Sequence, residues 1–319
     1  MKIGLLIEAQ QDLDWDMWRN VAKSADELGF DSLWRSDHLV ALYGQMPGAA
    51  SDALLSLAIA AEVTDRIELG TMVASVTFRH PSALARQAAQ IDDLSGGRFT
   101  LGVGAGWHDG EHTEYGIDFP PIGERMDRLR ETILYCRAVW SDGPASFNGK
   151  HYRAEEVHGL PRPAQNPLPV LVGGSGERRT LRIVAELADE WNVTGRDLPN
   201  YAHKLEVLQG HCDAVGRDIG VIRRSIAAPF AVGVDDADLG ARMEKLKARV
   251  PTLTGDPRNP SLLGDHRGPG GWFSGTPDEL VDQLGRLSEQ GVSRVMLQHL
   301  AHDDFSALEL LAARVLPQL

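Results

Sequence analysis

Short apolar runs alternate with longer amphipathic segments along nearly the whole chain. The first run, Lys2–Ile7, precedes a segment from Trp15 to Leu28 whose apolar residues recur every three or four positions, as on one face of a helix. Gly29 follows that segment, at the position where a glycine commonly ends a helix. Strand-like and helix-like segments that alternate in this way are typical of βα units around a parallel sheet.

Eight such units can be traced. The predicted strands are Lys2–Ile7, Ser32–Arg35, Ile67–Val73, Phe99–Val103, Pro169–Val172, Glu190–Val193, a run within Arg223–Gly233, and Ser293–Leu297. The predicted helices are Trp15–Leu28, Ala53–Glu62, Ser82–Leu94, Ile122–Trp140, Gly176–Leu187, Pro199–Val215, Ala237–Val250, Thr276–Gln290 and Phe305–Val315. The sequence therefore predicts an α/β protein of the (β/α)₈ TIM-barrel class.

Two stretches depart from this pattern. Residues 145–153 predict a small hairpin, and the region from Val234 to Ser274 is a long insertion after the seventh strand, of the kind that often covers a site. Regular structure resumes at Thr276-Pro277-Asp278-Glu279, a capping box that marks a helix start. Since no low-complexity linker divides the chain, we expect one domain over residues 1–319 with an insertion at about 234–274.

Composition and charge limit the kinds of molecule that this protein is expected to bind. The 319 residues are 43% hydrophobic and 24% charged, as in ordinary globular proteins, and the formal net charge of −13 argues against nucleic acid or an anionic membrane as a partner. The first apolar run is too short for a secretory or membrane segment, so the expected location is the cytoplasm. Cys136 and Cys212 are isolated, which favours buried apolar roles over a metal or redox pair.

Glycine-rich and basic residues follow the fifth and sixth strands. Gly173-Gly174-Ser175-Gly176 joins a predicted strand to a helix, so its backbone N–H groups are suited to a phosphate. A tight βα turn is an equally good explanation of the glycines alone. Arg196, after the next strand in Thr194-Gly195-Arg196, favours the anion site because its guanidinium can pair with the same phosphate.

His38 follows Asp37 directly after the second strand, where barrel active sites lie. An imidazole there is suited to exchanging a proton with a bound ring system near neutral pH, although a surface histidine is the commoner explanation. His108 and His112, with acids between them, raise the alternative of a divalent metal site in a TIM-barrel hydrolase. An exposed polar turn explains that cluster more simply, and we predict that the protein binds no metal ion.

Five motifs occur together in one order along the chain. They are Leu33–His38, Leu69–Val73, His80-Pro81 leading into Leu94–Arg98, Leu101–Trp107, and Gly173–Gly176. On these motifs the chain resembles the luciferase-like superfamily of flavin- and F420-dependent oxidoreductases over nearly its whole length. The resemblance implies the barrel fold, an F420-dependent oxidoreductase activity and, as an alternative cofactor, FMN.

The resemblance also implies roles for individual residues. In F420-dependent members the Asp-His pair faces the deazaflavin, a non-prolyl cis peptide lies behind its ring, and the glycine loop holds the phosphate. His38 is accordingly the catalytic candidate, and the cis peptide is expected at Met72-Val73. The candidate cofactor-binding residues are Asp37, Met72, Val73, Gly104, Gly106, Gly173, Gly174, Ser175, Gly176, Thr194 and Arg196.

Two positions differ from the family's sugar-phosphate dehydrogenases, which carry an acid where this chain has Trp107 and a Trp where it has Leu42. The resemblance therefore implies hydride transfer between F420 and a small organic substrate that is not assigned, with a homodimer as one expected assembly. The alternatives are an FMN-dependent monooxygenase, a metal-dependent hydrolase using His38, His108 and His112, and a non-catalytic flavin-binding relative.

Overall fold

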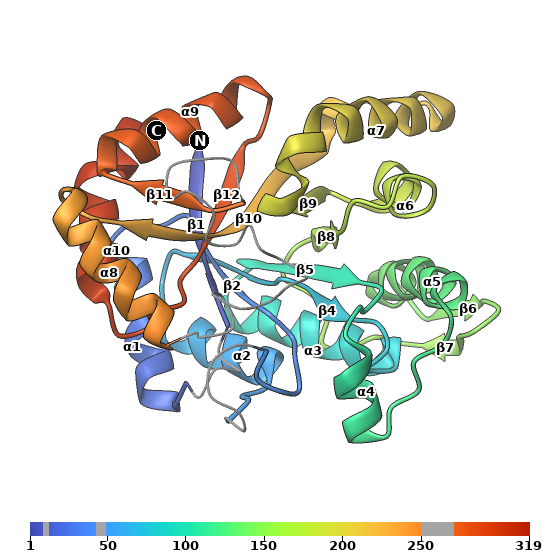
Figure 1. The fold of residues 1–319 in the computed structure, drawn as a ribbon. Coiled ribbons are helices and arrows are strands. Elements are labelled where there is room, and N and C mark those ends of the chain that lie inside the picture. The colour runs from blue at the N-terminus through green and yellow to red at the C-terminus, as the bar shows by residue number, and fades with distance from the viewer. Residues whose placement is uncertain (9–12, 43–48, 250–270) are drawn as a thin grey trace.

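The computed structural model describes residues 1–8, 13–42, 49–249 and 271–319, and within them eight parallel strands close into a barrel (Figure 1). The barrel strands, in spatial order, are β1 (Lys2–Ile7), β2 (Ser32–Arg35), β3 (Glu68–Thr71), β5 (Phe99–Gly104), β8 (Val170–Gly173), β9 (Glu190–Thr194), β10 (Arg223–Val232) and β12 (Arg294–Gln298). β12 pairs with both β10 and β1, which closes the ring. The predicted TIM barrel is confirmed.

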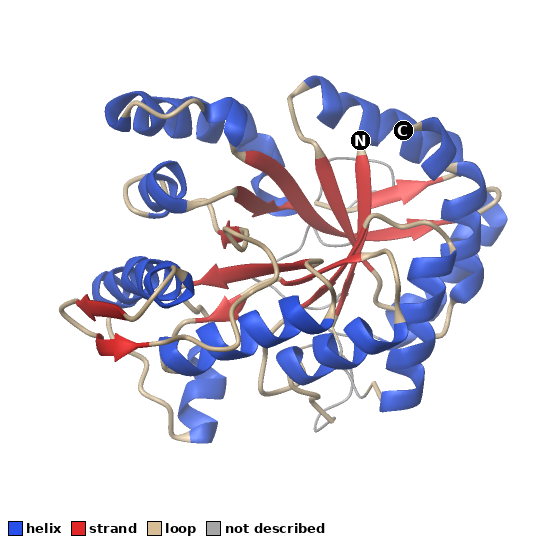
Figure 2. Ribbon diagram, turned by 180° about the vertical axis from the view of Figure 1, so that it is seen from behind, coloured by secondary structure: helices blue, strands red, loops and turns tan. Residues whose placement is uncertain are grey.

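Helices surround the barrel on its outside (Figure 2). They are α1 (Trp15–Glu27), α2 (Ala53–Val63), α3 (Pro81–Leu94), α4 (Asp109–Tyr115), α5 (Ile122–Trp140), α6 (Thr180–Leu187), α7 (Tyr201–Val215), α8 (Asp236–Arg249), α9 (Pro277–Glu289) and α10 (Phe305–Arg314). Short 3₁₀ helices in the described residues include Gly195–Asn200, Ile219–Val221 and Leu316–Gln318. None of the helices in the described ranges combines the length and apolar character needed to span a bilayer.

Local sequence accounts for where several helices begin and which face they bury. Asp14 caps α1 by accepting a hydrogen bond from the backbone N–H of Met17, and the helix buries the predicted stripe that includes Trp18 and Val21. α9 begins at the predicted capping box, in which Thr276 and Glu279 satisfy each other's backbone N–H groups. α5 has the predicted bounds.

Three elements differ in detail from the sequence expectation. α6 begins at Thr180, so the predicted helix start at Gly176 is wrong: a turn over residues 177–179 lies between the glycine loop and the helix. The third strand is interrupted after Thr71, and β4 (Ala74–Ser75) continues it against β5. The predicted hairpin is longer than expected, with β6 (Ala145–Asn148) antiparallel to β7 (Arg153–Val157).

The insertion after β10 is described only in part. It begins with α8 and ends at β11 (Phe273–Gly275), which pairs in parallel with β10. The insertion was predicted to cover a site. About half of it, residues 250–270, lies outside the described residues.

An ionic cluster closes the N-terminal end of the barrel. Buried Arg294, the first residue of β12, forms ion pairs with Glu68 of β3, with Glu190 of β9 (3.1 Å) and with Asp31 before β2 (2.9 Å). We call these four residues the Arg294 cluster. Burial alone would lower the pKa of Arg294, but the three carboxylates outweigh it and raise that pKa. The guanidinium therefore stays charged and ties strands from both halves of the chain together.

Candidate functional site

A cavity of about 520 Å³ opens at the C-terminal ends of the barrel strands. That volume is within the roughly 300–1,000 Å³ typical of ligand pockets. The predicted residues that line it are Asp37, His38, Met72, Val73, Gly104, Gly106, Gly173, Gly174, Thr194 and Arg196. Ser175 and Gly176 are not among the residues that line it, and Thr180 at the start of α6 lies there instead. The predicted residues in this lining come from five strand ends, those of β2, β3, β5, β8 and β9, and are thus brought to one place.

The Met72-Val73 peptide bond is cis, as predicted, and it lies between β3 and β4. Val73 packs where two neighbouring strands end in glycine. A methyl group added to Gly104 would lie 2.6 Å from Val73 Cγ2, and one added to Gly173 would lie 3.0 Å from Val73 Cγ1. Glycine at these two positions therefore makes room for the Val73 side chain, which forms part of the cavity wall.

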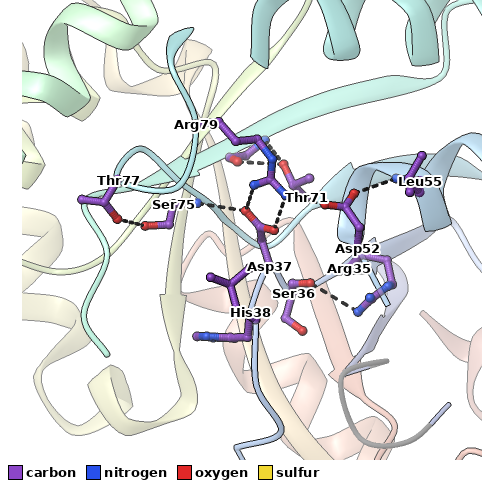
Figure 3. A network of polar contacts seen from close by, with 12 residues as sticks. Arg35, Ser36, Asp37, His38, Asp52, Leu55, Thr71, Ser75, Thr77 and Arg79 are labelled. Atoms are coloured by element: carbon purple, nitrogen blue, oxygen red, sulfur yellow. Dashed lines mark hydrogen bonds and ion pairs between the residues drawn. The ribbon is translucent and has the colours of Figure 1, made fainter. Parts of the chain in front are cut away.

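Asp37 is buried and held by charge (Figure 3). Arg79 donates to both of its carboxylate oxygens, at 2.5 and 3.0 Å, and the backbone N–H of Ser75 donates to one of them at 3.3 Å. Arg79 also reaches Asp52, the N-cap of α2, at 2.7 Å. Both Asp37 oxygens are thus engaged by protein donors, and the pair fixes the loop that carries the neighbouring His38.

His38 lines the cavity, and its Nδ1 lies 2.9 Å from Glu111 Oε1. The other Glu111 oxygen accepts the backbone N–H of Leu39 at 2.9 Å, so one carboxylate holds both the ring and its loop. Glu111 belongs to α4, whose N-cap is His108 and whose last residue precedes Gly116 in the left-handed conformation. Since Glu111 and His112 are buried in this helix, the interpretation of residues 108–112 as an exposed polar turn is wrong.

The charges around His38 favour its protonated form. Burial lowers the pKa of His38, but the hydrogen bond to Glu111 and the charges of Glu8, Glu111 and Asp37 outweigh that effect and raise it. For Glu111, burial raises the pKa, whereas the His38 contact and the Leu39 N–H lower it by more. Both shifts stabilise an imidazolium beside a carboxylate.

A second polar group, Glu8, lines the cavity directly after β1. Ser36 and Gln298 each donate a hydrogen bond to its carboxylate, and the Gln298 contact is 2.6 Å long. Glu8 and Gln298 lie at strand ends, but neither was among the predicted site residues. Asn192 was also missed: it points inward from β9 and donates to Ser225 Oγ at 3.0 Å.

Two residues of the predicted anion loop, Gly173 and Gly174, line the cavity. Gly174 has φ +118°, a conformation that side chains disfavour. Thr194, at the end of the neighbouring strand β9, also lines the cavity and caps a 3₁₀ helix through a reciprocal pair of hydrogen bonds with Asp197. Arg196 in that helix is exposed and also lines the cavity, so a cation lies on the same wall.

The metal alternative does not match the geometry of these histidines. His112 donates from Nδ1 to the His108 carbonyl at 2.7 Å, and its Nε2 lies 2.7 Å from the Thr77 hydroxyl. His38 binds Glu111. Across residues 1–8, 13–42, 49–249 and 271–319, no group of three or more His, Cys, Asp or Glu side chains is placed to hold a metal ion.

Comparison with known proteins assigns the family. The family model for luciferase-like monooxygenases matches residues 1–294. The chain belongs to the luciferase-like monooxygenase family. An F420-dependent glucose-6-phosphate dehydrogenase of Microbacterium testaceum is 30% identical over 311 residues, which cover 92% of this chain and 90% of that protein. An uncharacterized protein of Mycobacterium tuberculosis is 36% identical over 167 residues, so the match spans 52% of this chain and 58% of that relative.

Solved structures share the fold of this luciferase-like family member. The coenzyme F420-dependent tetrahydromethanopterin reductase from Methanopyrus kandleri gives a TM-score of 0.78 at 22% identity and covers 99% of both chains. The FMN complex of the oxygenating constituent of 3,6-diketocamphane monooxygenase from Pseudomonas putida gives 0.76 at 20% identity and covers 100% of this chain and 99% of that chain. Proteins named for either cofactor thus have this barrel, and the fold alone does not choose between them.

The two positions at which this family member departs from the sugar-phosphate dehydrogenases both lie in the cavity. Leu42 and Trp107 line it, and the Trp107 ring stands edge-on to His38 with ring centroids 5.7 Å apart. Trp107 is 65% exposed, so a large apolar surface faces the cavity mouth beside the candidate catalytic ring. The departures therefore lie where a substrate would meet His38.

Proposed function

We propose that this protein is an F420-dependent oxidoreductase that transfers a hydride between the deazaflavin and a small organic substrate. The observation that carries the proposal is the cavity itself. It brings His38, which is held by Glu111, to the same mouth as the Met72-Val73 bulge and the glycine loop after β8. The relatives named as F420-dependent dehydrogenases, among them one 30% identical over most of both chains, support the choice of F420.

The residues present fit a flat ring with a phosphate tail. The Met72 and Val73 side chains give the cavity an apolar wall, and Gly104 and Gly173 leave the room in which the Val73 side chain packs. Gly173 and Gly174 offer backbone, and Arg196 offers a guanidinium, on the side expected to hold the phosphate. The proposed cofactor-binding residues also include four others that line the cavity: Asp37, Gly104, Gly106 and Thr194. Two further predicted residues do not line it and stay predictions: Ser175 and Gly176.

His38 would supply the proton that accompanies hydride transfer. F420, when bound, supplies a ring carbon that carries hydride. Because Glu111 occupies Nδ1, the ring nitrogen left for a bound molecule is Nε2. In the reducing direction Nε2–H donates a proton to the substrate atom that gains the electron pair, and solvent then reprotonates the ring; oxidation reverses these steps. The substrate we expect is a small organic molecule, and Trp107 and Leu42 argue against a sugar phosphate.

Three broader expectations belong to the same proposal. We expect one domain over residues 1–319, a cytoplasmic location, and assembly as a homodimer without nucleic acid or membrane partners. The net charge of −13 supports the absence of anionic partners, because such partners would be repelled.

An FMN-dependent monooxygenase is the second candidate function. The barrel of an FMN-bound monooxygenase resembles this one nearly as closely as that of the F420-dependent reductase does, with TM-scores of 0.76 and 0.78. Such an enzyme would use reduced FMN and oxygen, so the cofactor that binds separates the two proposals.

Anaerobic titration of the purified protein with F420 and with FMN, followed by fluorescence, tests the function. We expect micromolar F420 binding without comparable FMN binding. In His38→Asn, F420 affinity should change by no more than a few-fold, while turnover across a panel of alcohols and carbonyl compounds falls roughly 10²–10⁴-fold. Binding of FMN but not F420 would contradict the proposal, and F420 binding without any turnover of a broad panel would favour a non-catalytic relative.

A further inference from the structure

The His38–Glu111 contact joins two elements far apart in the chain. His38 follows β2, whereas Glu111 lies 73 residues later on α4. The Glu111 side chain is 2% exposed and that of His38 is 14% exposed, so water screens the contact weakly. The 2.9 Å separation is normal for a hydrogen bond between an imidazole nitrogen and a carboxylate.

Glu111 is itself held in place. Its Oε2 accepts the Leu39 N–H at 2.9 Å, and its own backbone N–H donates to His108 Nδ1 at 3.2 Å. A carboxylate fixed through its other oxygen and its backbone selects one arrangement of the ring, with the proton on Nδ1 and Nε2 left for other partners. This arrangement follows the logic of a histidine oriented by a buried acid.

The charged groups that face His38 come from several elements. Glu111 lies on α4, Glu8 at the end of β1, and Asp37 beside His38 itself, and all three attract a positive ring. Arg79 offsets Asp37 through their ion pair, and His108 acts on Glu111 from the start of α4. With Asp37 neutralised in this way, Glu111 is the carboxylate in direct contact with the ring, and it provides the largest of the attractive effects.

We propose that Glu111 is the positioning residue for His38: its carboxylate accepts the Nδ1–H of the ring, which leaves Nε2 as the atom that exchanges a proton with a bound molecule. The part of this inference that concerns turnover rests on the proposed function, whereas the part that concerns the ring can be measured without cofactor. The consequence for the enzyme is that the reaction needing a proton from Nε2 continues to a higher pH than an isolated histidine would permit.

An NMR titration of the histidine rings in the cofactor-free protein tests the ring itself. The His38 signals are assigned by their loss in His38→Asn. We expect wild-type His38 to titrate above the roughly 6.5 of an isolated histidine. In Glu111→Gln, which keeps the size of the side chain but removes its charge, the midpoint should fall by about one pH unit or more. Glu111→Asp should recover part of that shift.

Glu114→Gln is the matched control, because Glu114 is an exposed carboxylate on the same helix. It should leave the His38 midpoint unchanged. With F420 bound, the alkaline limb of the kcat/KM profile for reduction should move to lower pH in Glu111→Gln by the same amount as the midpoint. A one-unit shift corresponds to about a tenfold loss on that limb.

An unchanged midpoint in folded Glu111→Gln overturns the inference. Should that variant fail to fold, the wild-type titration still decides, since a His38 midpoint at or below that of an isolated histidine also overturns it. A shifted midpoint in a protein that neither binds nor turns over F420 would leave Glu111 as the positioning residue and remove the proposed function.

Discussion

At the residue scale, the site depends on two acid–base pairs whose members come from different parts of the chain. Asp37 with Arg79 fixes the loop after β2, and Glu111 with His38 fixes the ring that this loop presents. Figure 3 shows Arg79 and His38 on different sides of Asp37. The first pair therefore serves the second, because a displaced loop would carry His38 away from Glu111.

Replacing Arg79 by Met should destabilise the protein by about 3–5 kcal/mol, because the buried Asp37 carboxylate loses its counter-charge. Arg130→Met provides the control: Arg130 pairs with Glu186 on the surface, and its loss should cost no more than about 1 kcal/mol. The measurement is urea unfolding at pH 7. Adding Asp37→Asn to Arg79→Met should restore part of the stability, and similar values for the two single variants would show that burial of the pair is unimportant.

The sequence allowed one member of each pair to be found but not the partners. His38 and Asp37 stand directly after a strand, and that position alone made them candidates. Arg79 and Glu111 lie 42 and 73 residues beyond their partners, and no periodicity connects them. Glu111 was hidden further by its polar neighbours, which resemble a surface turn until α4 folds and buries one side.

At the element scale, hydrophobic patterning was sufficient for the barrel and insufficient for its irregular parts. Apolar runs gave all eight strands because barrel strands are buried on both faces. The start of α6 was placed four residues too early, since Gly176 gives no signal that distinguishes a turn from a first helical residue. The seven-residue α4 is too short for an apolar repeat to appear.

Glycines in the strands provide a prediction at this scale. A methyl group added to Gly102 in β5 would lie 1.9 Å from the backbone oxygen of Thr71, which cannot move without separating β3 from β5. We expect Gly102→Ala to cost several kcal/mol, at or above the roughly 1–3 kcal/mol typical of overpacking.

Gly210 in α7 is the control, because a methyl group there meets nothing within 4 Å. Gly210→Ala should stabilise the protein by about 0.5–1 kcal/mol, since alanine is the better helix former. Chemical unfolding of both variants measures the difference. Equal effects would mean that the close approach of β3 to β5 relaxes freely.

At the scale of the whole molecule, two buried histidines make stability depend on pH. His299 and His302 follow β12, and neither Nε2 has a hydrogen-bond partner in the described part of the chain. Burial lowers the pKa of His299 to about 4 and that of His302 to about 3. In the unfolded chain both rings would bind a proton near pH 6.5. The unfolded state thus binds more protons in mild acid, and acid favours unfolding.

The free energy of unfolding should therefore fall as the pH is lowered from 7 to 5, by about 2 kcal/mol for each of these histidines. His302→Leu should remove about half of that fall, as measured by urea unfolding at the two pH values. His38 changes stability with pH in the opposite direction. Because its pKa is raised in the folded state, it stabilises the fold fully below pH 6.5, and this contribution is lost as the pH rises through its pKa in the folded protein. A stability that stays level from pH 7 to 5 would contradict the assignment of buried neutral rings.

The Arg294 cluster stabilises the barrel at the end opposite the ligand cavity. Its ion pairs join β3, β9 and β12 at their first residues, at the opposite end of the strands from the cavity. Loops that shape the cavity can consequently be exchanged without loosening the base that aligns the strands. Such a division makes the scaffold evolvable: gene duplication followed by loop replacement can explore new substrates while each descendant inherits a base that already folds.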